Sequence, residues 1–150
     1  PVKDPNRINR GELIAGCVVQ LFLIGGLNFF YISIGYIDLS AENPRLIGML
    51  SQEFHQVVPW LTAAWVLDIL LKLFVLTQGR WNRPARWLEV AITGFGLYVL
   101  ARILMIEAIT IVPVFTTMVK LSLGIVVVIV AIDLVGKLYR LVSPGNFRAQ

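Results

Sequence analysis

Residues 57–77 read VVPWLTAAWVLDILLKLFVLT, an apolar block whose only charged side chains are Asp68 and Lys72. A helix rises 1.5 Å per residue, so about 20 residues cross the ~30 Å hydrocarbon core of a bilayer. A strand of a membrane β-barrel would instead show strict alternation over about ten residues, and this block does not alternate. The block therefore predicts a membrane-spanning helix.

Three further apolar blocks of similar length accompany this one. Hydrophobic residues make up 57% of the chain and charged residues 15%, whereas soluble domains carry about 25% charged residues. We therefore expect an all-α polytopic membrane domain at 12–138, between a cytoplasmic flank at 1–11 and a cytoplasmic tail at 139–150. Its predicted spans cover about residues 12–35, 57–77, 87–109 and 116–136.

The distribution of Lys and Arg predicts that both ends of the chain are cytoplasmic. With four spans, the basic side of the membrane carries nine Lys and Arg residues: Lys3, Arg7, Arg10, Arg80, Arg83, Arg86, Lys137, Arg140 and Arg148. The opposite side carries two, Arg45 and Lys120. Cytoplasmic loops are the ones enriched in Lys and Arg. This asymmetry predicts an N-in/C-in topology.

The net charge of +4 indicates attraction to anionic lipid headgroups and no nucleic-acid surface. The predicted contacts with these lipids are the arginines of the loop after the second span, namely Arg80, Arg83 and Arg86. Tryptophans at span ends are typical interfacial anchors; here they are Trp60, Trp81 and Trp87. Residues 37–56 form the outer connection, and their pattern allows a short surface helix or a segment folded back over the bundle.

Charged residues inside the predicted spans are the candidate functional residues, because ionisable groups at bilayer depth cost several kcal/mol unless paired. Asp68 and Lys72 have the i, i+4 spacing of a helical ion pair, as do Asp133 and Lys137. Rise per residue places Arg102 within about 6 Å of Asp68 along the membrane normal. We therefore predict an interhelical charge network of Asp68, Lys72, Arg102 and Asp133 that fixes the last three helices.

The alternative role for these charges is transport. A small proton or ion transporter, or a channel subunit, would use Asp68 and Arg102, and it would need an ionisable group left unpaired in a cavity. The predicted network matches acids and bases one to one, which favours a structural role. Gln20 and Asn28, eight residues apart in the first span, are suited to hydrogen bonds between helices.

The sequence lacks the residues of an enzyme, and we expect no cofactor and no metal site. Cys17 is the single cysteine and His55 the single histidine, so a zinc site or a bis-histidine haem within one chain has too few ligands. No Gly-rich phosphate loop, nucleophile elbow or HExxH motif occurs.

Four segments carry a family resemblance: DPNRINRGELI at 4–14, LNFFYISIG at 27–35, LTQGRWNRPARWLEV at 76–90 and AIDLVGKLYRL at 131–141. Through them the chain resembles the membrane region of bacterial proteins with an N-terminal HAAS signalling domain, often encoded beside PadR-type regulators. The resemblance implies a bacterial inner (cytoplasmic) membrane protein with a soluble cytoplasmic module upstream of Pro1. It implies no catalytic residues.

Two functions follow as expectations. The first is a non-enzymatic membrane module that binds other membrane proteins, as accessory subunit of a larger complex or as membrane anchor of a signalling protein. The second is the transporter or channel subunit. An Asp68 buried against Arg102 or Lys72 would favour the first, and an unpaired Asp68 in a wet cavity the second.

Overall fold

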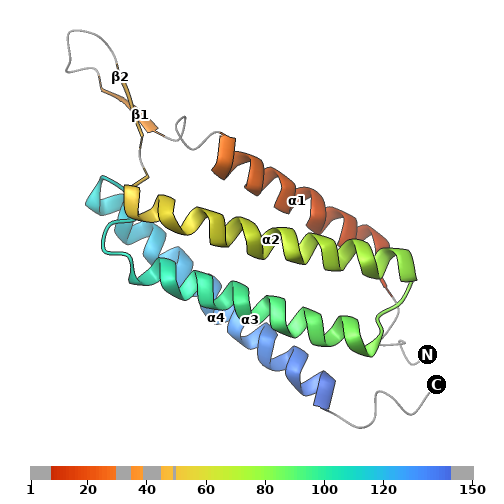
Figure 1. Cartoon of the computed structure of the whole chain (residues 1–150). Helices are drawn as coiled ribbons and strands as arrows, with labels where there is room; N and C mark the ends of the chain where they lie inside the picture. The colour runs from red at the N-terminus through yellow and green to blue at the C-terminus, as the bar shows by residue number, and fades with distance from the viewer. Residues whose placement is uncertain (1–7, 30–34, 39–44, 49, 143–150) are drawn as a thin grey trace.

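The computed structural model describes residues 8–29, 35–38, 45–48 and 50–142. This part of the chain forms four long helices (Figure 1): α1 Arg10–Phe29, α2 Gln52–Gln78, α3 Arg83–Met105 and α4 Pro113–Val142. All four are long and apolar enough to cross a membrane. The structure therefore confirms the predicted set of four helices, each long and apolar enough to cross a membrane.

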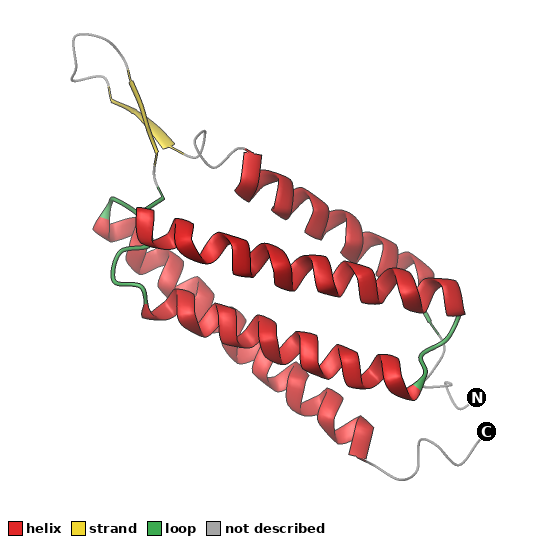
Figure 2. Cartoon of the chain, viewed as in Figure 1, coloured by secondary structure: helices red, strands yellow, loops and turns green. Residues whose placement is uncertain are grey.

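The connection between α1 and α2 contains a hairpin of two short strands (Figure 2). Strand β1, Gly35–Asp38, pairs antiparallel with β2, Arg45–Gly48, and Tyr36 lies opposite Ile47. The hairpin extends beyond the end of the bundle at which α2 begins (Figure 1). Residues 45–48 therefore form a strand, where a short surface helix was one of the two predicted alternatives.

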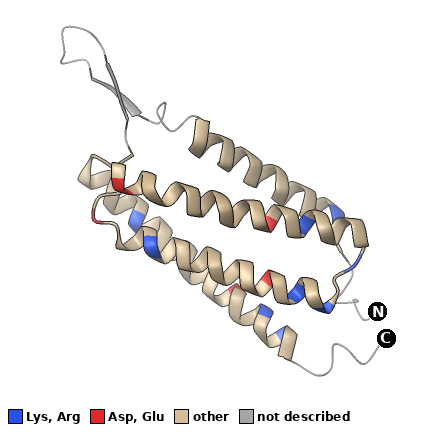
Figure 3. Ribbon diagram, viewed as in Figure 1, with Lys and Arg blue, Asp and Glu red and all other residues tan. Residues whose placement is uncertain are grey.

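The helices pack in chain order, α1 on α2, α2 on α3 and α3 on α4. Helix α1 begins, and α4 ends, at the same end of the bundle (Figure 1); this end is called the basic end below. Figure 3 shows that most Lys and Arg positions lie toward it. Residues 1–7 and 143–150, which include most of the predicted flank and tail, lie outside the described residues.

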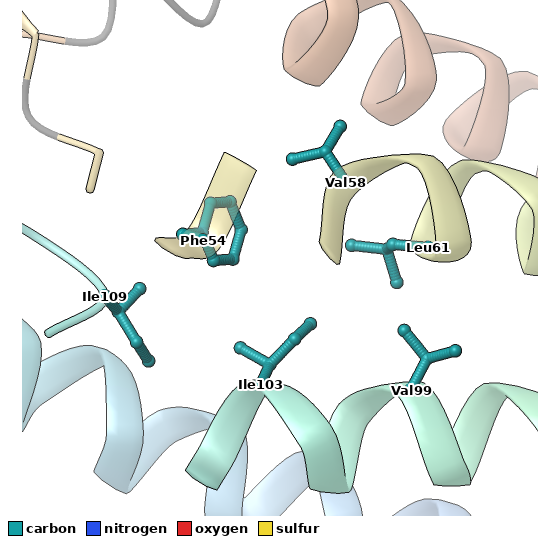
Figure 4. Packing of buried hydrophobic residues seen from close by; sticks show 6 residues of the cluster. All are labelled: Phe54, Val58, Leu61, Val99, Ile103 and Ile109. Carbon is teal, nitrogen blue, oxygen red and sulfur yellow. The ribbon is translucent and has the colours of Figure 1, made fainter. Parts of the chain in front are cut away.

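Two apolar clusters hold α2 and α3 together near their ends. At the end away from the basic end, side chains of α2, of α3 and of the loop after α3 interlock (Figure 4); they are Phe54, Val58, Leu61, Val99, Ile103 and Ile109. Toward the basic end, Leu71 and Val75 of α2 pack on Ala85 of α3. Between these two clusters, Ala64 and Ile69 of α2 are also buried, and Asp68 lies beside them in the same helix.

The helix ends differ from the predicted spans because capping residues set them. Helix α2 begins at Gln52 rather than 57, since the Ser51 side chain accepts a hydrogen bond from the backbone N–H of Phe54. Helix α3 begins at Arg83 rather than 87, because Asn82 caps it in the same way. It ends at Met105, four residues before the predicted 109.

The first and fourth helices also depart from prediction. Helix α1 ends at Phe29, and Gly35, the predicted end of the first span, belongs to β1. Helix α4 runs from Pro113 to Val142, so the helix continues through residues 139–142, the first part of the predicted cytoplasmic tail. Proline is well tolerated in a first helical turn, where its missing N–H has no helical acceptor to lose.

Candidate functional site

A polar chamber lies between the four helices toward the basic end. It has a volume of about 550 Å³, and a second cavity of about 230 Å³ shares Asp68, Asp133 and Lys137 with it. Its charged lining balances four acids, Glu12, Asp68, Glu89 and Asp133, against four bases, Lys72, Arg86, Lys137 and Arg140. The chamber is thus polar without carrying a large excess of either charge.

The first cluster in the chamber joins α1 to α2 through three side chains. The Lys72 Nζ lies 2.6 Å from Asp68 Oδ2 and donates a hydrogen bond of 3.0 Å to Gln20 Oε1. Gln20 Nε2 in turn donates to Asp68 Oδ2 at 2.6 Å. The three groups form a closed triangle, so each polar side chain satisfies the other two. Inside a bilayer, these mutual contacts would lower the free-energy cost of burying charged and polar side chains.

Gly16 makes room for this triangle. A Cβ atom at Gly16 would lie 3.1 Å from Lys72 Nζ, which is tighter than an ordinary van der Waals contact. Glycine at this position therefore lets the ammonium group of Lys72 approach the backbone of α1. Small residues permit such close approach between membrane helices.

The second cluster joins α3 to α4 and is centred on Glu89. Lys137 of α4 lies 3.4 Å from Glu89 Oε1 and 2.7 Å from Asp133 Oδ2, and its Nζ donates to Thr93 Oγ1 at 3.1 Å. Arg86 Nη1 lies 3.3 Å from Glu89 Oε2. The Glu89 side chain is only 14% exposed, so two cations satisfy one nearly buried carboxylate.

Of the predicted charge network, the structure shows the pair of Asp68 with Lys72. Asp133 lines the same chamber, but its ion pair is with Lys137 of its own helix, so the link from Asp133 to Asp68 and Lys72 stays a prediction. Arg102 does not join them: it is exposed and lines a separate cavity of about 250 Å³. The depth estimate placed it too far inward, because α3 ends at Met105 and Arg102 is therefore only three residues from that end (105 − 102).

Glu89 is the charged residue that sequence reasoning missed. A third span beginning at 87 puts Glu89 at the membrane surface, but α3 begins at Arg83, so Glu89 lies inside the helix. The signal that would have found it is the pair Asn82 and Pro84, a capping residue followed by a proline suited to a first helical turn. If the third helix is taken to begin just after Asn82, Glu89 lies deeper in the membrane, near the level of Lys137.

The polar residues predicted in the first span do bond to the second helix. Besides the Gln20 contacts, Asn28 Nδ2 donates a 2.9 Å hydrogen bond to Thr62 Oγ1. Gln20 and Asn28, which make these contacts, lie eight residues apart along α1. They are polar attachments of α1 to its neighbour at two levels, which is how polar side chains act between membrane helices.

The predicted interfacial residues fall into two groups. Trp60 and Trp87 are exposed, as are Arg80 and Arg83. Trp81 and Arg86 instead face each other, with the Arg86 guanidinium carbon 4.5 Å from the Trp81 ring centre, and both line the chamber. Arg86 thus contacts Trp81 and Glu89, and its role as a lipid contact stays a prediction.

Within the described ranges, no three His, Cys, Asp or Glu side chains gather so as to hold a metal ion. Comparison with protein-family models, with curated proteins and with solved structures finds no match for this chain.

Proposed function

We propose that this protein is a non-enzymatic integral membrane module that binds other membrane proteins, as accessory subunit of a larger complex or as membrane anchor of a signalling protein. The observation that carries the proposal is the pairing of Asp68 with Lys72 and Gln20. A carboxylate held at 2.6 Å by both a cation and an amide serves to fix helices. Proton-carrying sites instead commonly keep an ionisable group able to change its protonation state.

The apolar outer faces of the helices support a role in binding. None of the residues in the most apolar stretch of α4 is buried, and in α1 the buried share is 6%. On α1, an apolar cavity of about 420 Å³ is lined by Val18, Leu21, Phe22, Gly25 and Gly26. These residues recur at the spacing of one helix face. Glycines on such a face allow another membrane helix to approach closely.

The orientation that we propose is N-in/C-in, in the cytoplasmic membrane of a bacterium. The excess of Lys and Arg at the basic end supports this orientation, with exposed Arg80 and Arg83 placed to meet anionic headgroups. The resemblance to the membrane region of HAAS-domain proteins agrees with it, because that family carries its signalling module on the cytoplasmic side.

Co-purification tests this proposal. The tagged protein, extracted from native membranes in a mild detergent, is analysed by mass spectrometry beside a Phe22→Ala variant. We expect membrane proteins in stoichiometric amount with the unmodified chain and less of them with the variant, because Phe22 is 78% exposed on the apolar face of α1. Recovery of the chain alone, under conditions that keep other membrane complexes intact, contradicts the proposal.

The chamber favours a second candidate function, the transport of protons or of a small polar solute. Asp68 and Asp133 line both the chamber and the neighbouring cavity, and the Asp133 side chain is 55% exposed. Arg102 lines another cavity, so a path would involve these two carboxylates instead. Purified protein in liposomes with a pH-sensitive dye inside tests this function. Flux abolished by Asp133→Asn would support it, and flux equal to that of empty liposomes would exclude proton transport.

A further inference from the structure

We propose that the cavity between α2 and α3 around Arg102 binds the phosphodiester headgroup of an anionic phospholipid, in the leaflet away from the basic end. The cavity has a volume of about 250 Å³, and its polar lining consists of Gln56, Trp60, Tyr98 and Arg102. All four side chains carry hydrogen-bond donors. No carboxylate of the described residues lines the cavity. This composition is that of an anion site.

Arg102 differs from Lys72, Arg86 and Lys137, which line the chamber. Lys72, Arg86 and Lys137 each lie within 4 Å of a carboxylate. In the described part of the chain, the guanidinium of Arg102 makes neither an ion pair nor a hydrogen bond. Because arginine stays charged in proteins, an exposed Arg102 near the end of α3 is placed to meet an anion from its surroundings. A phosphate accepts a bidentate pair of hydrogen bonds from a guanidinium.

The polarity of the cavity changes with depth in the way that a phospholipid does. Arg102 is three residues from the end of α3 (105 − 102) and Gln56 four from the start of α2 (56 − 52), so both lie about 5 Å from the helix ends. Trp60 and Tyr98 lie eight and seven residues inward (60 − 52, 105 − 98), or about 11 Å. The polar donors thus sit at headgroup level and the aromatic rings below them.

The surroundings of the cavity favour a lipid over a free anion. Trp60 is 60% exposed and Tyr98 59% exposed, so their rings present apolar surface to the bilayer. Trp60 packs edge to face on Phe95, with ring centres 6.5 Å apart and planes at 65°, which fixes the indole beside the cavity. Amphipathic rings of this kind are enriched at the membrane interface. Glycerol and the first acyl carbons of a lipid would contact them.

Lipid binding to purified protein tests the proposal. Native mass spectrometry of the full chain in detergent is titrated with phosphatidylglycerol, with phosphatidylcholine and with inorganic phosphate. We compare Arg102→Gln with Lys120→Gln, which removes a cation at the same end of the bundle. Lys120 is a matched control because its Nζ donates to the backbone carbonyl of Glu107 at 3.2 Å and it does not line the cavity.

The expected result is that Arg102→Gln weakens binding of phosphatidylglycerol about tenfold, the scale of one lost charge-assisted pair, while Lys120→Gln changes it less than twofold. Equal binding by the Arg102 variant and the unmodified chain overturns the proposal. If millimolar inorganic phosphate displaces the lipid, the site binds a free anion, and the proposal of a lipid ligand is overturned. If Arg102→Gln does not fold, Gln56→Leu must lower the affinity several-fold, and unchanged affinity overturns the proposal.

Discussion

At the scale of single residues, the stability of this bundle depends on polar groups that satisfy one another. Lys72, Asp68 and Gln20 form a closed set of three contacts between α1 and α2. The Lys72 and Asp68 side chains are 20% and 27% exposed, so their pair is weaker than a fully buried one. Removing one member still leaves the others short of partners in a low-dielectric setting.

Asp68→Ala is expected to destabilise the protein by about 1–2 kcal/mol, below the 3–5 kcal/mol typical of a fully buried pair. The cause is an ammonium group on Lys72 that keeps only its bond to Gln20. Thermal unfolding in detergent measures the effect, with Glu107→Gln as control because Glu107 is exposed. The double variant Asp68→Asn, Lys72→Gln should recover part of the loss, since no charge is then unpaired. A stability equal to that of the unmodified chain would argue against the triangle.

The turn before α4 rests on a second set of mutually satisfied groups. Thr116 Oγ1 accepts a hydrogen bond from the Thr110 backbone N–H at 3.0 Å and donates to the Thr110 carbonyl at 3.0 Å, and both residues are buried. Thr116→Val keeps the shape and leaves that N–H unsatisfied.

We expect Thr116→Val to cost about 1–3 kcal/mol, the desolvation penalty of a buried unpaired group. Thr117→Val next to it removes a hydroxyl that is exposed, and should cost much less. Chemical or thermal unfolding of the two variants side by side checks the difference. Equal losses would show that the hydroxyl of Thr116 has no special role.

The residues also show how far sequence reasoning reaches. The i, i+4 spacing of Asp68 and Lys72 identifies their pair without a structure, because one helix turn fixes it. The predicted depths of Arg102 and Glu89 in the membrane are inaccurate for the same reason, because both depend on where α3 begins and ends. A shift of four residues moves a side chain about 6 Å along the membrane normal. That distance separates a headgroup contact from an interior ion pair.

At the scale of elements, apolar length predicts that the four helices exist, and local hydrogen bonds decide where they stop. A hydropathy pattern averages over about 20 residues and gives no sharp end. Ser51, Asn82 and Gly79 supply those ends through side-chain and backbone bonds. The β1–β2 hairpin was not predicted, because its apolar residues also fit a helical face.

Gly79 ends α2 in a left-handed conformation, with φ of 72°, and its N–H bonds to the Val75 carbonyl at 3.0 Å. Gly79→Ala should destabilise the protein by about 1 kcal/mol, because a Cβ atom disfavours that conformation. Gly94→Ala gives the opposite control. Gly94 lies inside α3, and a Cβ there meets nothing within 4 Å, so alanine should be neutral or stabilising. Unfolding curves of both variants in one detergent give the sign of each change in stability. A stabilising Gly79→Ala would contradict this account of the helix end.

At the scale of the whole molecule, the helices divide into a central pair and two outer helices. Helices α2 and α3 supply most of the buried residues of both apolar clusters, and partly buried residues of the outer helices, Leu13, Leu27 and Leu123, pack against them. Polar bonds add to this packing: Gln20 and Asn28 join α1 to α2, and Lys137 joins α4 to α3. Large apolar faces of the outer helices remain exposed. Such faces meet lipid or another protein, and this choice is the central question about function.

Photo-crosslinking in native membranes tests the central claim most directly. A photoreactive amino acid replaces Phe22, which lines the apolar cavity on α1, and in a second variant it replaces Ile129, a comparably apolar position of α4 that is 60% exposed. Partner binding through α1 predicts a discrete protein adduct at Phe22 and a weaker one, or none, at Ile129. Adducts with lipid alone at both positions would contradict the claim that this module binds other membrane proteins.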